Sequence, residues 1–461
     1  MSTALLADLS GRLPDLLLKT DSADLEYYGR DWTRRWPPAP LAIALPSSVG
    51  EVQGLVRWAN EKRVAIVPSG GRTGLSGGAV AANGELVVSL ERMNRVLDFS
   101  PVDRILTVQP GVPLEVVHRA AEEQGLIYPV DFAARGSCTI GGSISTNAGG
   151  IRVIRYGNTR NWIAGLKLVA GNGELIDCNR GLVKNSSGYD LRQLAIGAEG
   201  TLGIVVEAQL WLTDPPPRSN VMLLALPSFD ALMAAFATLR DRLSLSAFEF
   251  LTDRGLFHVV AHGAQKPFGE DHRFYVVTEF DADTPEQEDA ALQAFSDLLE
   301  QGHVADGVIA QSQAQAAALW RLREGITESL ARHLPYKNDV SVRIGALPAF
   351  LAEITALLGA EYPHFDVVWF GHIGDGNLHI NVLKPADMEQ GEFVAQCEAV
   401  TRHLAEVLEK YGGSISAEHG IGLVKKKYLS STRSEAEIAI MRGVRRAFDP
   451  NGVMNPGKVF D

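Results

Sequence analysis

Glycine is concentrated in three segments of this 461-residue chain, residues 68–78, 136–150 and 197–203, and no other feature constrains the fold as strongly. Serine, threonine or asparagine is interleaved with the glycines in each segment. Without side chains, backbone N–H groups can approach a ligand closely, and successive amides form concavities that bind anions. One such cluster can be a simple turn, but three of them with polar side chains between the glycines predict a large, phosphate-bearing cofactor.

Two common nucleotide-binding motifs do not occur in the sequence. We find neither G-x-G-x-x-G nor the Walker loop G-x-x-x-x-G-K-[ST]. These motifs place a diphosphate on a tight turn before a helix. The sequence therefore gives no support to NAD bound at a Rossmann turn or to ATP bound at a P-loop.

Composition and charge exclude several classes of protein. Hydrophobic residues make up 46% of the chain and charged residues 21%, which is typical of a globular protein, and the length predicts two or three domains. A net charge of −12 argues against nucleic acid or an anionic membrane as the main partner. The three cysteines are too few for a disulfide framework. We see no secretory signal and no membrane-spanning run, so we expect a cytoplasmic protein without an integral membrane segment.

Strand and helix patterns alternate through the first 215 residues. Apolar runs predict strands at 41–45, 65–68, 86–90, 105–108 and 204–212. Helices are predicted after Ser47 or Ser48, either of which can cap the first one, and from Pro113. A hairpin is predicted over 167–177, with its turn at Asn172-Gly173. Pro215–Pro217 can continue neither a helix nor a central strand. We therefore predict domains at 1–215 and 216–410, followed by a C-terminal segment at 411–461.

Residues 367–382 carry two histidines in a predicted hairpin. Asp375-Gly376 between two strand-like runs is a strong hairpin signal. With these two as the turn residues, His372 lies directly opposite His379, at a spacing that suits two imidazoles converging on one ion. Asn381 then shares the face of His379.

A third ligand is suggested by Glu418, which is followed by His419. Two histidines and one carboxylate with an open position are typical of catalytic zinc. Mn²⁺ and Fe²⁺ suit the same set. The alternative is that the two histidines of the hairpin only hydrogen-bond each other. We favour the metal, because a facing pair and a nearby Glu-His make a fuller set of ligands.

A helix is predicted around Leu319–Leu330, with Arg323 and Thr327 as neighbours on one face. An arginine can bind a carboxylate through two N–H groups while the threonine donates its hydroxyl. Lys337 follows shortly after. On physical grounds alone, an arginine on a helix is more often a solvated charge or part of an ion pair.

The three glycine-rich segments, including Gly197-Ala198-Glu199-Gly200-Thr201-Leu202-Gly203, resemble the FAD-binding domain of the vanillyl-alcohol oxidase superfamily. The second half resembles the FAD-linked D-2-hydroxyacid dehydrogenase branch of that superfamily. The resemblance implies an α+β fold: a two-subdomain FAD-binding domain of the vanillyl-alcohol oxidase type, an α+β cap domain and a C-terminal helical segment returning to the flavin. Some relatives tether FAD through a histidine in the first glycine loop. Arg72 lies in that loop here, and the loop has no histidine, so we expect non-covalent FAD.

The resemblance also assigns roles to individual residues. It makes His372, His379 and Glu418 the metal ligands, His419 the base, and Arg323, Thr327 and Lys337 the binding group for a far carboxylate, while Asn381 steadies the near one. The expected FAD contacts are Pro68, Ser69, Gly70, Gly71, Arg72, Thr73, Gly74, Leu75, Ser137, Thr139, Gly141, Gly142, Ser145, Thr146, Asn147, Gly149, Gly150, Glu199, Gly200, Gly203, Ile204 and Asn455.

The implied reaction is the oxidation of D-2-hydroxyglutarate to 2-oxoglutarate, with D-malate as a shorter substrate. Electrons would pass to a non-NAD acceptor such as an electron-transfer flavoprotein or a quinone. Two alternatives stay open: a D-lactate or glycolate dehydrogenase of the same architecture, and a non-catalytic flavoprotein subunit of an electron-transfer complex. The oligomeric state is also open, with a homodimer among the options.

Overall fold

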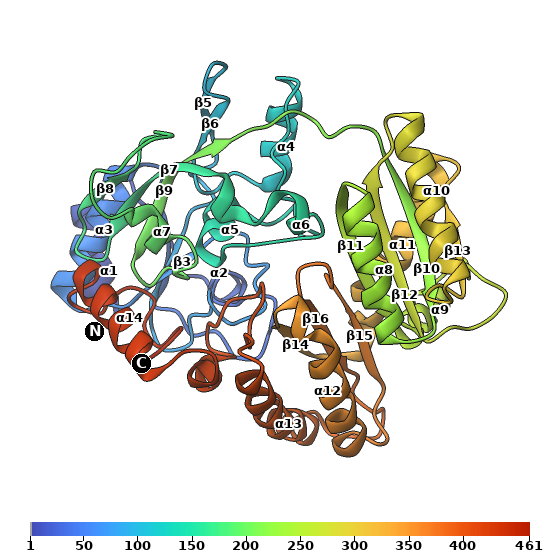
Figure 1. Cartoon of the computed structure of the whole chain (residues 1–461). Helices are drawn as coiled ribbons and strands as arrows, with labels where there is room; N and C mark the ends of the chain where they lie inside the picture. The colour runs from blue at the N-terminus through green and yellow to red at the C-terminus, as the bar shows by residue number, and fades with distance from the viewer. Residues whose placement is uncertain (1) are drawn as a thin grey trace. The chain divides into compact units, whose positions relative to one another are not determined.

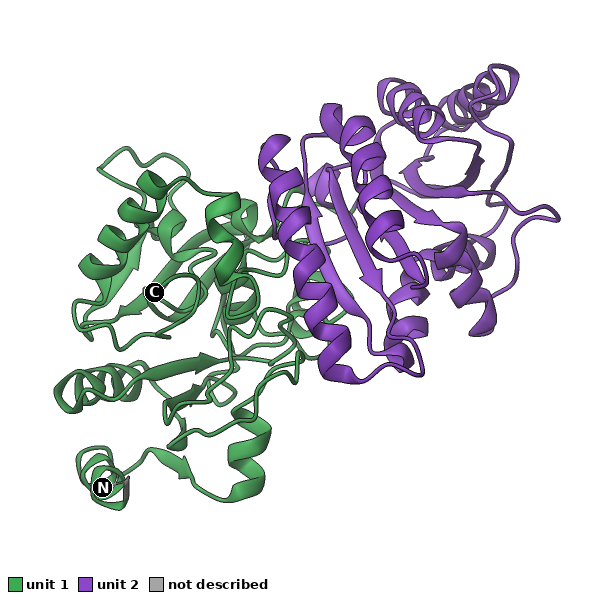
Figure 2. Ribbon diagram, turned by 90° about the horizontal axis from the view of Figure 1, so that it is seen from below, with its two compact units in different colours: residues 1–149, 157–215, 418–461 green, residues 150–156, 216–417 purple. Residues whose placement is uncertain are grey.

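The computed structural model describes residues 2–461, which form two compact units (Figures 1 and 2). Unit 1 contains the residues up to Gly149, Gly157–Pro215 and Glu418–Asp461, and unit 2 contains Gly150–Tyr156 and Pro216–Ala417. The first expected boundary coincides with the change of unit at Pro215. The second change of unit comes at 417/418, seven residues beyond the expected position. The sequence did not predict that residues 150–156 belong to unit 2.

Unit 1 begins with a four-stranded sheet covered by helices. Its elements are α1 (Ser2–Arg12), β1 (Leu17–Lys19), α2 (Ser22–Tyr28), β2 (Ala42–Leu45), α3 (Val49–Lys62), β3 (Ile66–Ser69) and β4 (Leu86–Ser89). The strand order is β1-β2-β4-β3, with β2, β4 and β3 parallel. The predicted cap of α3 is confirmed, because the Ser48 hydroxyl accepts a hydrogen bond from the backbone N–H of Glu51.

The second sheet of unit 1 has five antiparallel strands in the order β5-β6-β9-β7-β8. The elements are β5 (Val96–Ser100), β6 (Ile105–Val108), α4 (Leu114–Glu122), α5 (Ile140–Thr146), η1 (Thr159–Trp162), β7 (Ile163–Ala170), β8 (Leu175–Cys178), α7 (Leu191–Ala195), β9 (Gly203–Trp211), η4 (Lys426–Ser431) and α14 (Glu435–Phe448). The predicted β7–β8 hairpin is confirmed. Its loop has four residues, Gly171 to Glu174, and Gly173 within it has a φ of +83°.

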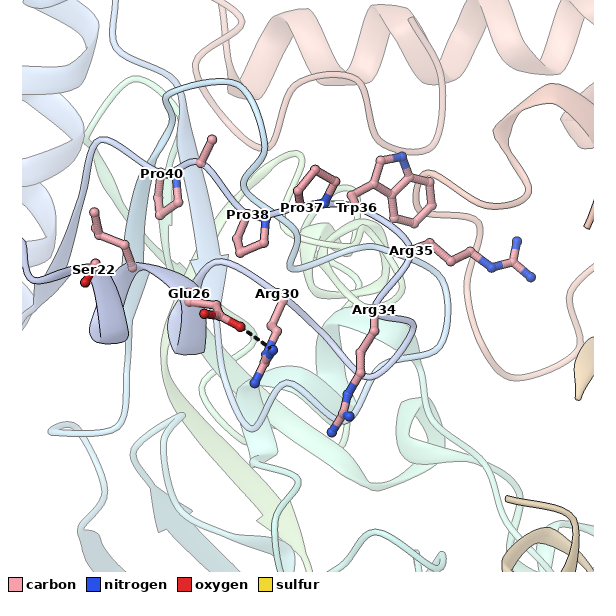
Figure 3. Close-up of a pocket in the computed structure, with 11 residues that line it drawn as sticks. Ser22, Glu26, Arg30, Arg34, Arg35, Trp36, Pro37, Pro38 and Pro40 are labelled. Atoms are coloured by element: carbon pink, nitrogen blue, oxygen red, sulfur yellow. Dashed lines mark hydrogen bonds and ion pairs between the residues drawn. The ribbon is translucent and has the colours of Figure 1, made fainter. Parts of the chain in front are cut away.

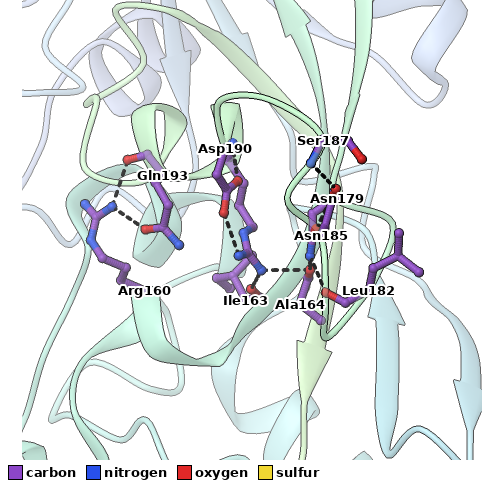
Figure 4. A network of polar contacts seen from close by, with 10 residues as sticks. Arg160, Ile163, Ala164, Asn179, Leu182, Asn185, Ser187, Asp190 and Gln193 are labelled. Atoms are coloured by element: carbon purple, nitrogen blue, oxygen red, sulfur yellow. Dashed lines mark hydrogen bonds and ion pairs between the residues drawn. The ribbon is translucent and has the colours of Figure 1, made fainter.

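Two arginines hold α7 in place just before the third glycine segment (Figure 4). Arg160 donates to the backbone oxygens of Gln193 and Ile196, at 2.8 Å in each case. Arg192 donates to the backbone oxygens of Ile163 and Ala164. Arg160 thus links η1 to α7, and Arg192 links α7 to the start of β7, in each case through backbone carbonyl groups.

The C-terminal segment completes unit 1 by returning to β3. The backbone N–H of Ile66 donates to the carbonyl of Val453, and the Asn455 N–H donates to the carbonyl of Ile66. The Asn455 side-chain amide donates to the Glu199 carbonyl at 2.7 Å and to the Gly78 carbonyl at 2.9 Å. Chain positions almost four hundred residues apart are thus joined within one core.

Unit 2 is built on a seven-stranded antiparallel sheet in the order β13-β10-β12-β11-β15-β16-β14. Its elements are α6 (Val153–Tyr156), β10 (Ser219–Leu226), α8 (Phe229–Arg242), β11 (Leu245–Thr252), α9 (Asp253–Ala261), β12 (Phe274–Asp281), α10 (Pro285–Glu300), β13 (Asp306–Ile309), α11 (Gln313–Leu330), η2 (Ala331–His333), β14 (Tyr336–Ser341), η3 (Ile344–Ala346), α12 (Leu347–Glu361), β15 (Val367–Gly371), β16 (Asn377–Val382) and α13 (Gln390–Lys410).

The two faces of this sheet bury different side chains. On one face, Leu251 and Phe370 pack in a cluster with Leu322 and Ile326 of α11. On the other face, aromatic rings of β11 meet α8, as in the Phe236–Phe248 pair with ring centroids 4.8 Å apart. Helix α11 therefore lies on the face that carries Leu251 and Phe370.

Residues 344–361, which include α12, are the one stretch among residues 2–461 that is long and apolar enough to cross a membrane. Core helices of soluble proteins pass the same test of length and composition, so this stretch does not assign the chain to a membrane.

Glu199 is a buried carboxylate that anchors the C-terminal segment of unit 1. Its two oxygens accept hydrogen bonds from the backbone N–H groups of Ile421 and Gly422, at 2.7 and 2.8 Å. Burial raises the pKa of Glu199 to about 7, although these hydrogen bonds act in the opposite direction.

This raised pKa predicts a pH-dependent stability. Between about pH 4.5 and pH 7 folded Glu199 keeps a proton that the unfolded chain releases, so the free energy of unfolding falls by up to about 1.4 kcal/mol per pH unit as the pH rises. Denaturant unfolding of the wild type and Glu199→Gln at pH 5, 6, 7 and 8 measures this. The stability of the variant relative to wild type should rise up to pH 7 and then level off. A difference that stays constant across the series would contradict the prediction.

Candidate active site

The three glycine-rich segments come together in unit 1. A Cβ on Gly70 would lie 2.4 Å from the Thr139 hydroxyl, and one on Gly71 would lie 1.9 Å from the Ser137 carbonyl. The first segment therefore packs so closely on the second that no side chain fits between them. The third segment joins the second through a hydrogen bond from the Glu199 N–H to the Ser145 carbonyl, at 2.8 Å.

Two buried hydroxyl groups at this junction lack hydrogen-bond partners among the described residues. They are Ser69 Oγ at the end of β3 and Thr139 Oγ1 just before α5. A buried hydroxyl without a partner is costly, so a polar ligand is expected to satisfy it. Both are among the residues expected to contact FAD, and a diphosphate offers the acceptors that they require.

The remaining expected FAD contacts lie on the same segments, except Ile204 of β9 and Asn455 of the C-terminal segment. Gly150, at the end of the second segment, belongs to the stretch 150–156, which is part of unit 2. Asn147 ends α5 in the left-handed conformation, and its side-chain oxygen accepts the N–H of Arg160.

Arg72 is held by the chain's own aromatic rings. Its guanidinium lies 4.5 and 4.7 Å from the ring centroids of Tyr27 and Tyr28, and its Nη1 donates to the Gly70 carbonyl at 3.1 Å. Its φ is +58°, in the left-handed region. Arg72 thus fixes the shape of the first glycine loop by stacking on the two tyrosines.

A hollow of about 690 Å³ on unit 1 is separate from this cradle (Figure 3). Its lining includes Arg30, Arg34 and Arg35, with Glu26 paired to Arg30 at 2.9 Å. The predicted site residues do not line it.

The histidine hairpin forms in unit 2, but in a different register from the predicted one. His379 lies opposite Phe370, and not opposite His372. The loop is longer than two residues, because the Asn377 N–H closes it by donating to the His372 carbonyl. The shift amounts to two residues, and since the side-chain period of a strand is also two, both histidines stay on one face. Their ring centroids are 5.3 Å apart.

Each histidine has a buried carboxylate beside its Nδ1 atom. Glu249 Oε1 of β11 lies 2.8 Å from Nδ1 of His372. Asp339 Oδ1 of β14 lies 3.6 Å from Nδ1 of His379, and Asn377 donates to the same oxygen at 2.8 Å. An imidazole that donates its Nδ1–H to a carboxylate presents the Nε2 lone pair to a metal.

Glu418 and His419 follow directly after a segment paired with β14. Ser414 and Ser416 form bridges with Ser341 and Asp339. Two groups of described side chains have ligand atoms that all lie within 4.8 Å of one another: His372, His379 and Glu418, and Asp339, His379 and His419. The first group is the predicted ligand set, and its two nitrogens and one carboxylate suit a divalent cation such as zinc.

The predicted carboxylate-binding residues lie on β14, β16 and α11. Lys337 of β14 lies directly opposite Asn381 of β16, next to the Asp339–His379 pair on the same face of the sheet. Burial lowers the pKa of Lys337. Arg323 is only 5% exposed, and its guanidinium lies 4.8 Å from the Phe370 ring centroid. Thr327, one turn further along α11, is exposed.

Arg323 has N–H groups that donate no hydrogen bond to any described residue. Its Nη2 lies 2.8 Å from Glu249 Oε2, but the geometry is not that of a directed hydrogen bond. Its Nε and Nη2 are both buried without a hydrogen-bond partner. Such a group is suited to bind an anion that arrives from outside the chain.

The sequence-based interpretation missed Glu249 and Asp339. Glu249 is an acidic residue within the mostly apolar strand Leu245–Thr252, and because a carboxylate in such a run is rare, this signal could have identified it. Asp339 lies in the strand Tyr336–Ser341, which is largely polar and gives no such signal.

Two family models match different parts of the chain. Residues 40–179 match the family described as "FAD binding domain", and residues 215–459 match "FAD linked oxidases, C-terminal domain". The chain is 70% identical over 461 residues to a D-2-hydroxyglutarate dehydrogenase of Xanthomonas citri pv. viticola, covering 100% of this chain and 98% of that protein. It is 53% identical to the Stutzerimonas stutzeri protein of the same name, covering 96% and 95%.

Solved structures support the same fold at low sequence identity. A p-cresol methylhydroxylase with bound substrate has a TM-score of 0.76 at 17% identity, and a 4-ethylphenol oxidase from Gulosibacter chungangensis has 0.76 at 19%. In both cases the match covers 99% of this chain and 97% of the other. The predicted α+β fold of the vanillyl-alcohol oxidase type is thereby confirmed. The chain belongs to the FAD-linked oxidases.

Proposed function

We propose that this protein oxidises D-2-hydroxyglutarate to 2-oxoglutarate, using non-covalent FAD and a divalent metal ion. The observation that carries the substrate assignment is the buried Arg323, whose unpartnered donors lie on the sheet face that also presents the two histidines. A dicarboxylate has a second anion for this guanidinium, whereas lactate and glycolate do not. Full-length relatives that bear the name D-2-hydroxyglutarate dehydrogenase, including the mitochondrial Bos taurus protein at 37% identity, support the same substrate.

Two bound groups would supply chemistry that the side chains lack. FAD would accept the hydride that leaves C2 of the substrate. A cation held by His372, His379 and Glu418 would lower the pKa of a hydroxyl group bound to it. Zinc is our first choice for this cation, and manganese and iron suit the same ligands.

The chain's own residues position the substrate and move its proton. Arg323 and Lys337, with Thr327 at the exposed end, would bind the far carboxylate, and Asn381 would hold the near one. His419 would take the hydroxyl proton as the general base. Asp339, which groups with His419 and His379, would stabilise the imidazolium that forms. Loss of the proton to His419 and of the hydride to the flavin leaves the 2-oxo acid.

The electrons would leave the flavin for a non-NAD acceptor, such as an electron-transfer flavoprotein or a quinone. The lack of a G-x-G-x-x-G motif in the sequence supports this choice.

Anaerobic mixing of the purified yellow protein with single substrates tests the reaction. D-2-hydroxyglutarate should bleach the flavin absorbance with the highest kcat/KM, D-malate should follow, and D-lactate and glycolate should be poor. A chelator should stop bleaching while the protein stays yellow, and added Zn²⁺ or Mn²⁺ should restore it. Fastest bleaching by lactate, or bleaching that resists complete metal removal, would refute this proposal.

Arg323→Gln tests the assignment of the second carboxylate. The kcat/KM for D-2-hydroxyglutarate should fall by about 10- to 100-fold, since a hydrogen-bonded charge contributes about 1.5–3 kcal/mol, while D-lactate should change by less than about threefold. Arg321→Gln is the matched control, because Arg321 is exposed on the same helix. Equal losses on both substrates would remove Arg323 from the specificity site.

His419→Gln tests the base. Flavin reduction should slow by about 10²- to 10⁴-fold, with FAD content unchanged. His403→Gln, on the solvent-exposed side of α13, is the control and should reduce at the wild-type rate. If the His419 variant reduces as fast as wild type in a single turnover, another group takes the proton.

A further inference from the structure

Glu249 touches two groups with different tasks in the proposed reaction. Its Oε1 lies 2.8 Å from Nδ1 of His372, and its Oε2 lies 2.8 Å from Nη2 of Arg323. Its side chain is 1% exposed, and those of Arg323 and His372 are 6% and 9% exposed. A single buried carboxylate therefore contacts both a proposed metal ligand and the proposed anchor of the far substrate carboxylate.

The strand register explains how these three side chains meet. Leu251 of β11 pairs with Phe370 of β15, so Glu249 and His372, each two residues away, extend the same register on the same face. Arg323 reaches this face from α11 and lies over the Phe370 ring. The position of Glu249 is thus set by the sheet, while those of its two partners come from a loop and a helix.

The two contacts of Glu249 differ in kind. The contact with His372 is a hydrogen bond, which fixes the tautomer and the ring orientation of the imidazole. The contact with Arg323 is an ion pair without hydrogen-bond geometry, so it neutralises the buried guanidinium without occupying its donors. Glu249 therefore lets Arg323 stay charged in a buried place and still offer N–H groups to an incoming carboxylate.

We propose that Glu249 is a positioning residue that couples metal affinity to dicarboxylate selectivity. This inference rests on the proposed function, because it assumes that His372 binds the metal and that Arg323 binds the far carboxylate. Glu249 would touch neither the metal nor the substrate. It acts on them through the orientation of His372 and through the charge of Arg323. The first task needs an accepting oxygen and the second needs a negative charge, and a carboxylate supplies both.

Glu249→Gln is the most informative change, because glutamine keeps the shape but has one acceptor and one donor. If its oxygen accepts from His372, its NH₂ group faces the guanidinium and repels it. If its oxygen faces Arg323, its NH₂ group forces His372 into the tautomer that carries a proton on Nε2. Either arrangement disrupts one partner, and exchange between them weakens both.

The experiment uses the FAD-loaded full chain and two separate readouts. The first is the Zn²⁺ dissociation constant, measured by chelator competition without substrate, which should rise by about 10- to 100-fold in Glu249→Gln. The second is the ratio of kcat/KM for D-2-hydroxyglutarate to that for D-lactate at saturating Zn²⁺, which should fall by at least tenfold.

Glu279→Gln is the matched control. Glu279 is also a buried glutamate, on the neighbouring strand β12, and it is paired with Arg152 and Ser246. Its replacement should leave both readouts within about twofold of wild type, and so show that the effects of Glu249→Gln are not those of any lost buried charge.

A change in only one of the two readouts, or in neither, overturns the coupling. If Glu249→Gln cannot be obtained folded, Zn²⁺ binding to Arg323→Gln decides, because Arg323 reaches His372 through Glu249. A shift of more than about threefold supports the coupling, and an unchanged constant overturns it. If the wild-type protein binds no metal, the proposed function itself is refuted. If the wild type binds metal and oxidises D-2-hydroxyglutarate but Glu249→Gln leaves both readouts unchanged, only this inference is refuted.

Discussion

Much of the site depends on one constraint: a charge buried in a sheet has to be neutralised by a neighbour that the sheet itself positions. Glu249 and Asp339 are almost fully buried in β11 and β14, and each lies beside an imidazole on the adjoining element. Isolated, either carboxylate would be expensive to bury. Each carboxylate lies beside a histidine, and this contact offsets part of the free-energy cost of burial. The same contact fixes the orientation of an imidazole ring that would otherwise rotate.

The same reasoning explains why the two units use polar groups differently. In unit 1 the cradle consists mainly of backbone, brought together by glycines whose missing side chains allow Gly71 to pack on Ser137. In unit 2 the polar groups are side chains, several of them on neighbouring strands of the antiparallel sheet. A flat cofactor with a diphosphate is well served by the first arrangement, and a small charged substrate by the second.

Local patterns predicted much of this fold. The capped helix α3, the β7–β8 hairpin and the change of unit at Pro215 each follow from a few neighbouring residues. The register of the histidine hairpin could not be predicted in this way, because Asp375-Gly376 indicates a turn but not the number of residues in the loop. The face of the histidines was nevertheless predictable, since an error of two residues preserves it. Glu249 escaped prediction for another reason: its partner His372 is 123 residues away, and only the pairing of β11 with β15 brings them together.

The return of the C-terminal segment to β3 has a consequence for how the polypeptide acquires its structure during synthesis. Val453 and Met454 belong to the same core cluster as the first strands and helices, and Lys458 donates to the Val80 carbonyl. A ribosome therefore exposes the N-terminal part long before the residues that close it exist. Unit 2 lies between these segments in the chain and can collapse on its own meanwhile. The nascent amino-terminal region has to remain unaggregated until residues 453–458 have been synthesised.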